Sequence, residues 1–430
     1  MSYYEEFVQG IGQVNYWLPI QQHQKNSNKI LALDLDWTLI KTKSNKKLPT
    51  DYNDWCFLYP NKLSIIKQYL DNGYKFVILS NQAIIDKGHP YDHNQFKDRW
   101  NQIYKELNNN GIFSVYLLYA IKDDFMRKPC KGMWDYFENK LNGNEHIIYK
   151  ESIYVGDACG RPKDHASTDL KLVLNINNGL EFKTPENFFL NNKTDINNTE
   201  KLIEMLNNDK NEFNPWEYVK NLSTQQIKLP REDKSISMLE YFNKSNKEVL
   251  SRLKDIINNN VKTCILFIGS PSSTKSSFYN NYLKDLITKD WLYTSLDRLN
   301  MKMPKYIKYL GEQFKKNYSC IIDNTNPDVK TRKKIITIAR SNNVSKIVTI
   351  YFNIEKPVIL HLNNMRNKKI NAKIINDKEK LPTVVIHTYL KKYEPLNMNE
   401  EDIDECMEWE FVPDIDNIKA KVDMFLQYLE

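Results

Sequence analysis

The chain has 430 residues, more than one typical domain, so its length predicts two domains. Hydrophobic content of 41% and charged content of 27% predict packed globular domains and argue against disorder. The net charge of +7 suits a polyanionic partner without requiring one. The six cysteines form no Cys-x-x-Cys pair, which disfavours zinc, and no apolar run reaches membrane-spanning length. We therefore expect an intracellular protein, nuclear or cytoplasmic, that is neither secreted nor membrane-bound.

Residues 1–29 are a short lead-in whose aromatic side chains can pack on the first domain. The apolar run Ile30–Leu33 then leads into Asp34, a pattern typical of a buried strand. Asp36 is two residues further on, so an extended backbone directs both carboxylates to the same side. Two close carboxylates repel each other unless a cation or a proton lies between them. The pair suits Mg²⁺, with one carboxylate attacking phosphorus and the other moving a proton; the alternative is a polar strand end that caps a turn.

Strand and helix patterns alternate over the rest of the first half. This alternation predicts an α/β fold with a parallel sheet covered by helices on both faces. The expected helices are 61–72, 94–109 and 131–141, and the expected strands are 74–80, 113–120, 153–156 and 172–175.

Polar residues stand at the carboxyl ends of the predicted strands, where such sheets bind ligands. Ser80 can donate a hydrogen bond to a phosphate oxygen, Lys128 can neutralise phosphate charge, and Asp157 can hold the metal. Each of them alone is more often an ordinary strand-end or loop residue. Their order, together with Asp34 and Asp36, favours the functional interpretation.

Residues 191–235 are rich in Asn and in charge, which predicts a solvated connection. We place the domain boundary within it, so that residues 1–225 form the first domain and residues 226–430 the second. A predicted helix over 235–258 and a strand over 263–268 open the second domain. Both domains are expected to be doubly wound parallel sheets.

The stretch after strand 263–268 is similar to Gly-x4-Gly-Lys-Ser/Thr, a loop whose backbone N–H groups cradle phosphates. Thr274 replaces the second Gly. For a residue with a Cβ atom, a backbone conformation with positive φ costs free energy. A loop that no longer binds nucleotide well is therefore the alternative. We favour binding because Lys275 and Ser276 are intact. The expected nucleotide-binding residues are Gly269, Ser270, Pro271, Ser272, Ser273, Thr274, Lys275, Ser276 and Asp323.

Longer strings in the first half resemble the phosphatase half of bifunctional polynucleotide kinase 3′-phosphatases, which is of the haloacid dehalogenase type. They are Asp34-Leu-Asp-Trp-Thr38, Arg127-Lys-Pro129, Tyr154-Val-Gly-Asp-Ala-Cys-Gly-Arg-Pro162 and Lys183-Thr-Pro-Glu-Asn-Phe-Phe-Leu190, with Trp37 where many members have Gly. The resemblance implies that Asp34 is the nucleophile and Asp36 the general acid/base, with Ser80 and Lys128 in the catalytic site. It implies Mg²⁺ ligation by Asp34, Asp36 and Asp157. Either Asp164 or Asp169 serves as a further acidic residue.

Strings in the second half resemble the kinase half of the same family. They are Asp297-Arg298-Leu299, Ile321-Ile-Asp-Asn-Thr-Asn-Pro-Asp328 and His361-Leu-Asn-Asn-Met-Arg366. The resemblance implies a P-loop kinase that uses ATP and Mg²⁺. It also implies that Asp297 is the general base and that Arg366 contacts the ATP phosphates. Ser276 would hold Mg²⁺, and Asp323 would help to organise the metal.

This resemblance implies an enzyme that removes 3′-phosphates and phosphorylates 5′-hydroxyls at strand breaks, in DNA repair. One alternative is a 3′-phosphatase whose degenerate kinase half binds nucleic acid; others are an RNA end-healing enzyme and a non-catalytic scaffold. Because residues 1–29 are too few for the forkhead-associated module of some members, we expect no recruitment through such a module. Basic residues at 330–334 are equally well explained as a solvated helix face or as contacts to a nucleic-acid strand.

Overall fold

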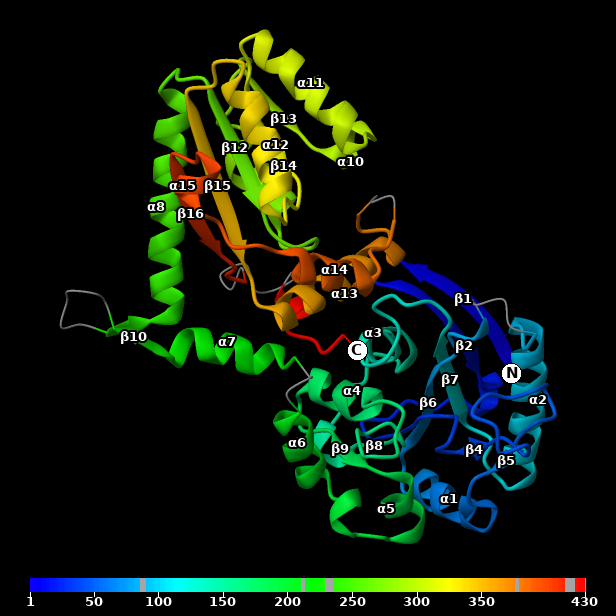
Figure 1. Cartoon of the computed structure of the whole chain (residues 1–430). Helices are drawn as coiled ribbons and strands as arrows, with labels where there is room; N and C mark the ends of the chain where they lie inside the picture. Colours follow the sequence, from blue (N-terminus) through cyan, green and yellow to red (C-terminus); the bar gives the residue numbers. More distant parts are fainter. Residues whose placement is uncertain (86–89, 210–212, 229–234, 376–378, 414–421, 430) are drawn as a thin grey trace. The chain divides into compact units, whose positions relative to one another are not determined.

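The structure is a computed structural model that describes residues 1–85, 90–209, 213–228, 235–375, 379–413 and 422–429 (Figure 1). The chain divides into two compact units. Unit 1 comprises residues 1–214, 364–380 and 426–430, and unit 2 comprises residues 215–363 and 381–425. Helix α13 (Lys356–Asn371) thus contributes residues to both units. The single boundary at 225/226 does not follow this division, and the limits of the functional domains stay a prediction.

Unit 1 is built on a seven-stranded sheet in the order β1-β2-β7-β6-β3-β8-β9. The strands from β7 to β9 are parallel, as the alternating pattern predicts. The lead-in forms an antiparallel hairpin that adds β1 and β2 to β7. The strands are β1 (Ser2–Val8), β2 (Gly12–Leu18), β3 (Ile30–Leu33), β6 (Lys75–Asn81), β7 (Val115–Ala120), β8 (Ile153–Val155) and β9 (Glu181–Lys183), with β4 (Ile40–Lys41) and β5 (Cys56–Phe57) paired separately.

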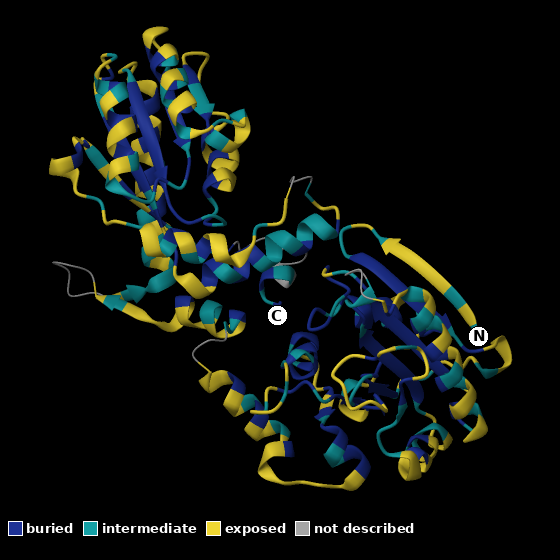
Figure 2. Cartoon of the chain, turned by 45° about the vertical axis from the view of Figure 1, so that its right-hand side comes forward, coloured by how far each residue is buried: buried dark blue, intermediate teal, exposed yellow. Residues whose placement is uncertain are grey.

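Helices cover both faces of this sheet because alternate strand residues serve two cores. Ile30 and Ala32 of β3 pack in a cluster with α3 and α4, and Leu31 and Leu33 pack in a cluster with α1 and α2. Figure 2 shows buried sheets beneath helices whose outer faces are exposed. The helices are α1 (Leu63–Asp71), α2 (His93–Asn109), α3 (Gly132–Tyr136, continued by a π-helical turn over Phe137–Leu141), α4 (Thr168–Ile176), α5 (Pro185–Leu190) and α6 (Thr199–Asn208).

Two sequence predictions in this region are wrong. Residues 172–175 lie inside helix α4 and form no strand, because a run of three apolar residues carries no period that separates a strand from a buried helix. Residues 191–235 contain helix α6 where the sequence suggests a short helix over Leu202–Leu206, but they also contain α7 (Pro215–Thr224) and β10 (Gln226–Lys228), so they are more than a solvated connection. The side chain of Asn197 in this stretch is buried.

Unit 2 contains a five-stranded parallel sheet in the order β13-β14-β12-β15-β16. Ile265 and Phe267 of β12 pack with α8, and Cys264 and Leu266 pack with α11 and α12. The strands are β12 (Thr263–Ile268), β13 (Trp291–Thr294), β14 (Ser319–Asp323), β15 (Lys346–Asn353) and β16 (Glu405–Glu410), and β11 (Ser235–Ser237) pairs with β10. The further helices are α8 (Met238–Asn258), α9 (Lys275–Phe278), α10 (Leu296–Leu299), α11 (Met303–Lys315), α12 (Val329–Arg340), α14 (Thr383–Lys392), α15 (Met398–Glu401) and α16 (Val422–Phe425).

The predicted fold class, α/β with two parallel-sheet domains, is confirmed. Among the described residues, no helix combines the length and the apolar character that crossing a membrane requires.

Candidate active sites

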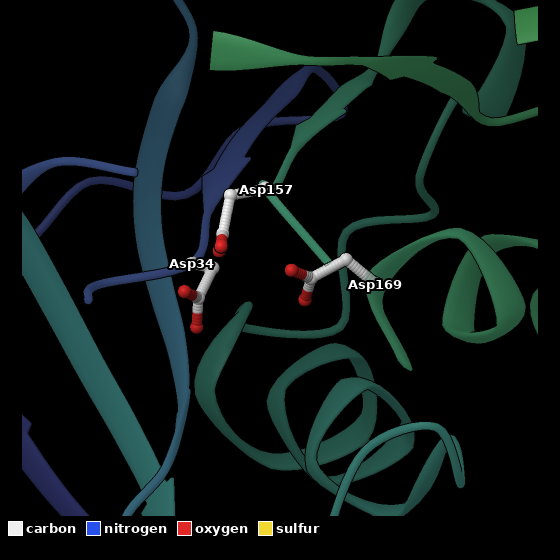
Figure 3. Close-up of side chains that lie close together, drawn as sticks. All are labelled: Asp34, Asp157 and Asp169. Carbon is white, nitrogen blue, oxygen red and sulfur yellow. The ribbon is translucent and has the colours of Figure 1, made fainter. Parts of the chain in front are cut away.

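Three aspartates from separate elements of unit 1 converge (Figure 3). Asp34 follows β3, Asp157 follows β8, and Asp169 lies in the first turn of α4. One oxygen of each lies within 4.8 Å of the others. Burial and the neighbouring carboxylates of Asp34 and Asp169 raise the pKa of Asp157 to about 9. The backbone N–H of Asp157 donates to Thr38 Oγ1 over 3.1 Å, which fixes the strand end beside Asp34.

The ammonium of Lys128 joins two of these carboxylates. Its Nζ lies 2.6 Å from Oδ1 of Asp34 and 2.7 Å from Oδ1 of Asp169, and it donates to the hydroxyl of Tyr154 over 3.0 Å. Burial disfavours the charged lysine, but the two carboxylates outweigh it and raise the pKa of Lys128. Three carboxyl groups thus share one ammonium, and this oxygen-rich set fits a hard divalent cation such as Mg²⁺.

Asp169 is the acidic residue that the structure brings to Asp34, whereas Asp164 is engaged elsewhere. Both oxygens of Asp169 are occupied, since Oδ1 bonds Lys128 and Oδ2 accepts from the backbone N–H of Ala158 over 3.1 Å. Asp169 is therefore suited to hold Lys128, which leaves Asp34 and Asp157 as the better placed metal ligands.

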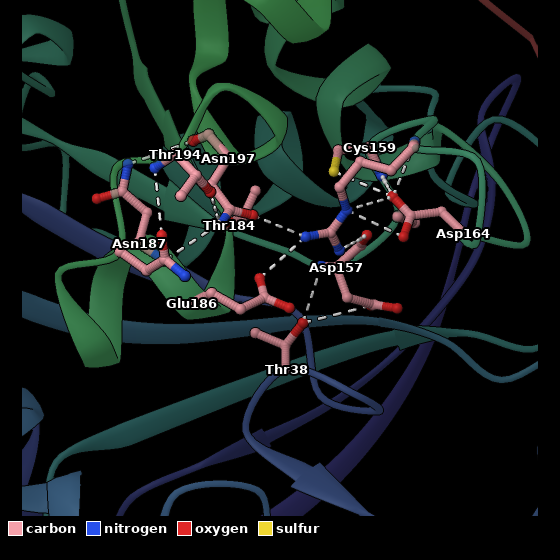
Figure 4. Close-up of polar contacts among 12 residues, drawn as sticks. Thr38, Asp157, Cys159, Asp164, Thr184, Glu186, Asn187, Thr194 and Asn197 are labelled. Carbon is pink, nitrogen blue, oxygen red and sulfur yellow. Dashed lines mark hydrogen bonds and ion pairs between the residues drawn. The ribbon is translucent and has the colours of Figure 1, made fainter.

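Arg161 ties the loop after β8 to two other segments, which carry Glu186 and Asn197. Figure 4 labels these two residues together with Asp157 and Asp164 of the loop. Its Nε lies 2.9 Å from Oδ2 of Asp164, and its Nη1 donates to Glu186 Oε2 and Asn197 Oδ1, each over 3.0 Å. Its Nη2 donates to the backbone oxygen of Asp157 over 3.1 Å. The guanidinium thus supports the loop that carries a candidate metal ligand.

Asp36 stands outside the carboxylate cluster of the described residues. Its carboxylate accepts from Arg99 Nη1 over 3.0 Å and from Gln82 Nε2 over 2.6 Å. The same Gln82 nitrogen donates to Ser80 Oγ over 2.8 Å, so two predicted catalytic residues share one amide. Trp37, between the two aspartates, has φ of 63°, the left-handed region that favours Gly. The expected metal ligation by Asp36 has no support from this geometry.

The loop after β12 in unit 2 closes around its own lysine. Lys275 Nζ donates to the backbone oxygens of Gly269 (3.0 Å) and Ser270 (2.6 Å). Burial lowers the pKa of Lys275 to about 8, although the carboxylates of Asp323 and Asp297 partly offset this shift. The amine of Lys275 is thus held within the loop by the loop's own backbone oxygens.

Two residues with Cβ atoms occupy the left-handed region in this loop. Thr274 and Ser272 both have φ of 63°. The penalty predicted for Thr274 is therefore present, and the loop adopts the turn nevertheless. A Cβ atom at Gly269 would lie 2.7 Å from Ser273 Oγ, so the first Gly is required for packing.

Asp323 connects the phosphate loop to the next strand. Its Oδ2 accepts from Ser276 Oγ over 2.6 Å and from the Tyr293 hydroxyl over 2.5 Å. Asp297 is exposed on the short helix α10, which follows β13. Its position beyond the carboxyl end of a parallel strand leaves the carboxylate accessible to a substrate.

The predicted lid is helix α13, and its residues divide between the two units. Asn363, which sequence reasoning did not single out, is buried, and its Oδ1 accepts from Ser272 Oγ of the phosphate loop over 3.0 Å. Arg366 belongs to unit 1, and its Nη2 donates to the backbone oxygen of Glu379 over 3.4 Å. A role for Arg366 at ATP stays a prediction.

A groove of about 920 Å³ lies along helices α11 and α12. The lysines at 330, 333 and 334 line it beside an apolar floor that includes Met303, Pro304 and Ile307. Arg332, which sequence reasoning counted with these lysines, is instead fully buried in an ion pair with Glu401 (2.6 Å). The three lysines are therefore exposed to solvent, whereas Arg332 is buried and pairs within the fold.

Comparison with known proteins finds one matching family and several relatives of the chain. The family described as "Polynucleotide kinase 3 phosphatase" matches residues 29–189. A "Bifunctional polynucleotide phosphatase/kinase" of Schizosaccharomyces pombe is 30% identical over 377 residues, covering 87% of this chain and 78% of the relative. The chain belongs to this family.

Two further relatives agree with the family assignment. A "Putative bifunctional polynucleotide phosphatase/kinase" of Acanthamoeba polyphaga mimivirus is 26% identical over 363 residues, covering 79% of this chain and 75% of the relative. A polynucleotide 3′-phosphatase of Arabidopsis thaliana is 32% identical over 178 residues, covering 39% of this chain and 25% of the relative. The family therefore accounts for both halves of the chain.

Proposed function

We propose that this phosphatase/kinase family member removes 3′-phosphates and phosphorylates 5′-hydroxyls at polynucleotide ends, and that it repairs DNA strand breaks. The observation that carries the phosphatase half is the convergence of Asp34, Lys128 and Asp157 at one sheet edge. The phosphate loop with Lys275, next to Asp323, supports the kinase half. RNA ends are the alternative substrate.

In the phosphatase half, we assign Asp34 as nucleophile. Its carboxylate attacks the phosphorus of the 3′-phosphate while the bond to O3′ breaks and Asp36 gives its proton to O3′. Water then attacks the aspartyl phosphate, Asp36 takes a proton from that water, and inorganic phosphate leaves. Lys128 offsets the charge of the Asp34 carboxylate. Asp34 and Asp157 would hold Mg²⁺, which when bound would neutralise charge on the phosphate.

In the kinase half, we assign Asp297 as general base. It accepts the proton of the 5′-hydroxyl as that oxygen attacks the γ-phosphorus of ATP, and ADP departs. Lys275 balances the negative charge of the phosphates. Ser276 and Asp323 are the residues that would hold Mg²⁺, and their 2.6 Å hydrogen bond places both oxygens at one point.

The groove along α11 and α12 supports a path for the nucleic-acid strand. Lys330, Lys333 and Lys334 offer charge to phosphates, and the apolar floor offers a surface for bases. Helix α11 begins six residues after Asp297, so the groove starts near the candidate base in sequence. We also propose an intracellular location, because all six cysteines, which lie in the described part of the chain, are unpaired.

The deciding experiment supplies ATP, Mg²⁺ and a nicked duplex that carries a 3′-phosphate and a 5′-hydroxyl, with each end followed separately. We expect both ends to change, Asp34→Asn to stop loss of the 3′-phosphate alone, and Lys275→Ala to stop 5′-phosphorylation alone. Full 3′-phosphatase activity in Asp34→Asn would refute the nucleophile. Loss of the 3′-phosphate without 5′-phosphorylation would identify a phosphatase whose second half binds nucleic acid. Matched RNA oligonucleotides decide the substrate.

A further inference from the structure

The loop that carries Lys128 is anchored at its start by residues of helix α13. This lysine loop, residues 121–131, connects β7 to α3. Nζ of Lys368 lies 2.6 Å from Oδ1 of Asp123 and 3.5 Å from the backbone oxygen of Asp124. Asn371 donates to the backbone oxygen of Asp123. These contacts join residues at least 244 positions apart in the sequence, all within unit 1.

The end of the lysine loop is anchored by residues near position 428. The backbone N–H of Lys131 donates to Gln427 Oε1 over 3.1 Å. Asn175 Nδ2 donates to the backbone oxygens of Pro129 (2.8 Å) and Tyr428 (2.9 Å), and its Oδ1 accepts from the N–H of Tyr428 (2.7 Å). Asn175 thus couples the loop to the C-terminal segment.

Between these anchors, Lys128 has little freedom. Its backbone N–H donates to Asn81 Oδ1 over 2.9 Å, and its backbone oxygen accepts from Asn81 Nδ2 over 3.0 Å. Its side chain is 2% exposed and ends 2.6 Å from Asp34. A shift of the loop backbone would therefore move the ammonium relative to the nucleophile.

The Lys368 side chain is only 3% exposed, and it pairs with an Asp123 side chain that is 56% exposed. Burial of an ammonium carries a large desolvation cost, and an apolar residue of similar size often stabilises a fold equally well. Overall stability therefore does not account for a lysine at this position. A directional contact to one loop does account for it.

We propose that Lys368, Gln427 and Tyr428 are positioning residues for the phosphatase reaction. They hold the lysine loop so that Lys128 meets Asp34, and thus the phosphatase site depends on segments that sequence reasoning assigned to the kinase. This inference rests on the proposed 3′-phosphatase function.

The test uses the full-length chain and a 3′-phosphorylated oligonucleotide, with kcat, KM and the unfolding midpoint measured for each variant. Lys368→Met should lower kcat about tenfold or more with little change in KM, because small misplacements of catalytic groups cost up to about 10²-fold in rate. Lys368→Arg should recover part of that loss. Lys193→Met, which removes an exposed charge elsewhere in unit 1, should match the wild type.

A contact that only stabilised the fold would lower the unfolding midpoint and leave kcat of the folded protein unchanged. Wild-type kcat in folded Lys368→Met would therefore overturn the inference, whereas a wild type without 3′-phosphatase activity would overturn the proposed function itself. If Lys368→Met does not fold, Asn371→Ala and Gln427→Ala each remove one anchor of the loop. Reduced kcat in these variants supports the inference, and wild-type kcat in both overturns it.

Discussion

Nη1 of Arg99 lies 3.0 Å from Oδ1 of Asp36, and the two side chains differ sharply in exposure, at 1% and 33%. The guanidinium therefore holds the candidate acid/base from the protein interior. Arg99→Lys keeps the positive charge but loses the pair of hydrogen bonds that Nη1 and Nη2 donate to Asp36. An ammonium group lacks the planar, forked geometry of the guanidinium that makes such a pair possible. We expect 3′-phosphatase kcat to fall about tenfold, a fraction of the 10²–10⁴ that an acid/base group contributes.

Steady-state kinetics on a 3′-phosphorylated oligonucleotide checks this expectation. Lys105→Ala is the control, because Lys105 is an exposed residue of the same helix. Unchanged kcat in Arg99→Lys would show that Asp36 does not need the guanidinium of Arg99.

Thr274→Gly should stabilise the protein and keep kinase activity. Thr274 has φ of 63°, and a β-branched residue pays about 1–2 kcal/mol there, so relief of about 1 kcal/mol remains after the added flexibility of Gly in the unfolded chain. Chemical denaturation measures the free energy of unfolding, and the KM for ATP reports whether the phosphate loop still accepts ATP. Thr288→Gly is the matched control: Thr288 does not have positive φ, and Gly should destabilise there. A Thr274→Gly variant that is less stable than the wild type would contradict backbone strain at Thr274.

Lys330→Gln and Lys333→Gln should weaken binding of single-stranded oligonucleotides and reduce its salt dependence. Each phosphate contact adds about one unit to the slope of log K against log salt, so the double variant should lose up to about two. Fluorescence anisotropy between low and moderate salt measures this slope. Lys315→Gln with Lys316→Gln, two exposed lysines around the end of α11 that do not line the groove, should leave it unchanged. Equal slopes for the wild type and the groove variant would show that these groove lysines do not contact the nucleic-acid strand.

Lys75 predicts a pH dependence of stability. Burial lowers its pKa from 10.5 to about 7, while its Nζ donates to the backbone oxygen of Leu141 over 2.6 Å. Between about pH 7 and pH 10.5 the unfolded chain binds a proton that the folded chain has released, so this group makes stability rise with pH across that window. Lys75→Met should flatten the rise. Urea midpoints of both proteins at pH 7, 8 and 9 measure it, and parallel curves would contradict the assignment.

The strand ends were predictable from the sequence because apolar runs that stop at Asp34 and Asp157 are local signals. Strand β12 has the predicted bounds, and the structure brings Lys128 to Asp34 as the strand order suggests. Local signals also gave the phosphate loop and its strained Thr274. The catalytic roles of these residues stay predictions.

The partners of these residues were not predictable. Arg99 lies in an ordinary helical pattern, and nothing in that pattern indicates that it reaches Asp36, 63 positions away. Tyr154 reads as one more apolar residue of a strand, although its hydroxyl accepts from Lys128. Asn175 was placed in a strand that does not exist, and its bonds to Pro129 and Tyr428 depend on long-range folding. Pairings of this kind are set by tertiary structure, which one sequence does not display.

The division of unit 1 into three stretches of sequence has a consequence for synthesis on the ribosome. Residues 1–214 emerge first, yet the residues from 426 onward that complete the same unit follow more than 200 positions later. At about 5–20 residues per second, the nascent unit waits roughly ten to forty seconds for its last segment. During that interval the lysine loop has its contacts to Asn81 and Asn175 but lacks the contact to Gln427, so the nascent unit holds Lys128 less completely than the folded one.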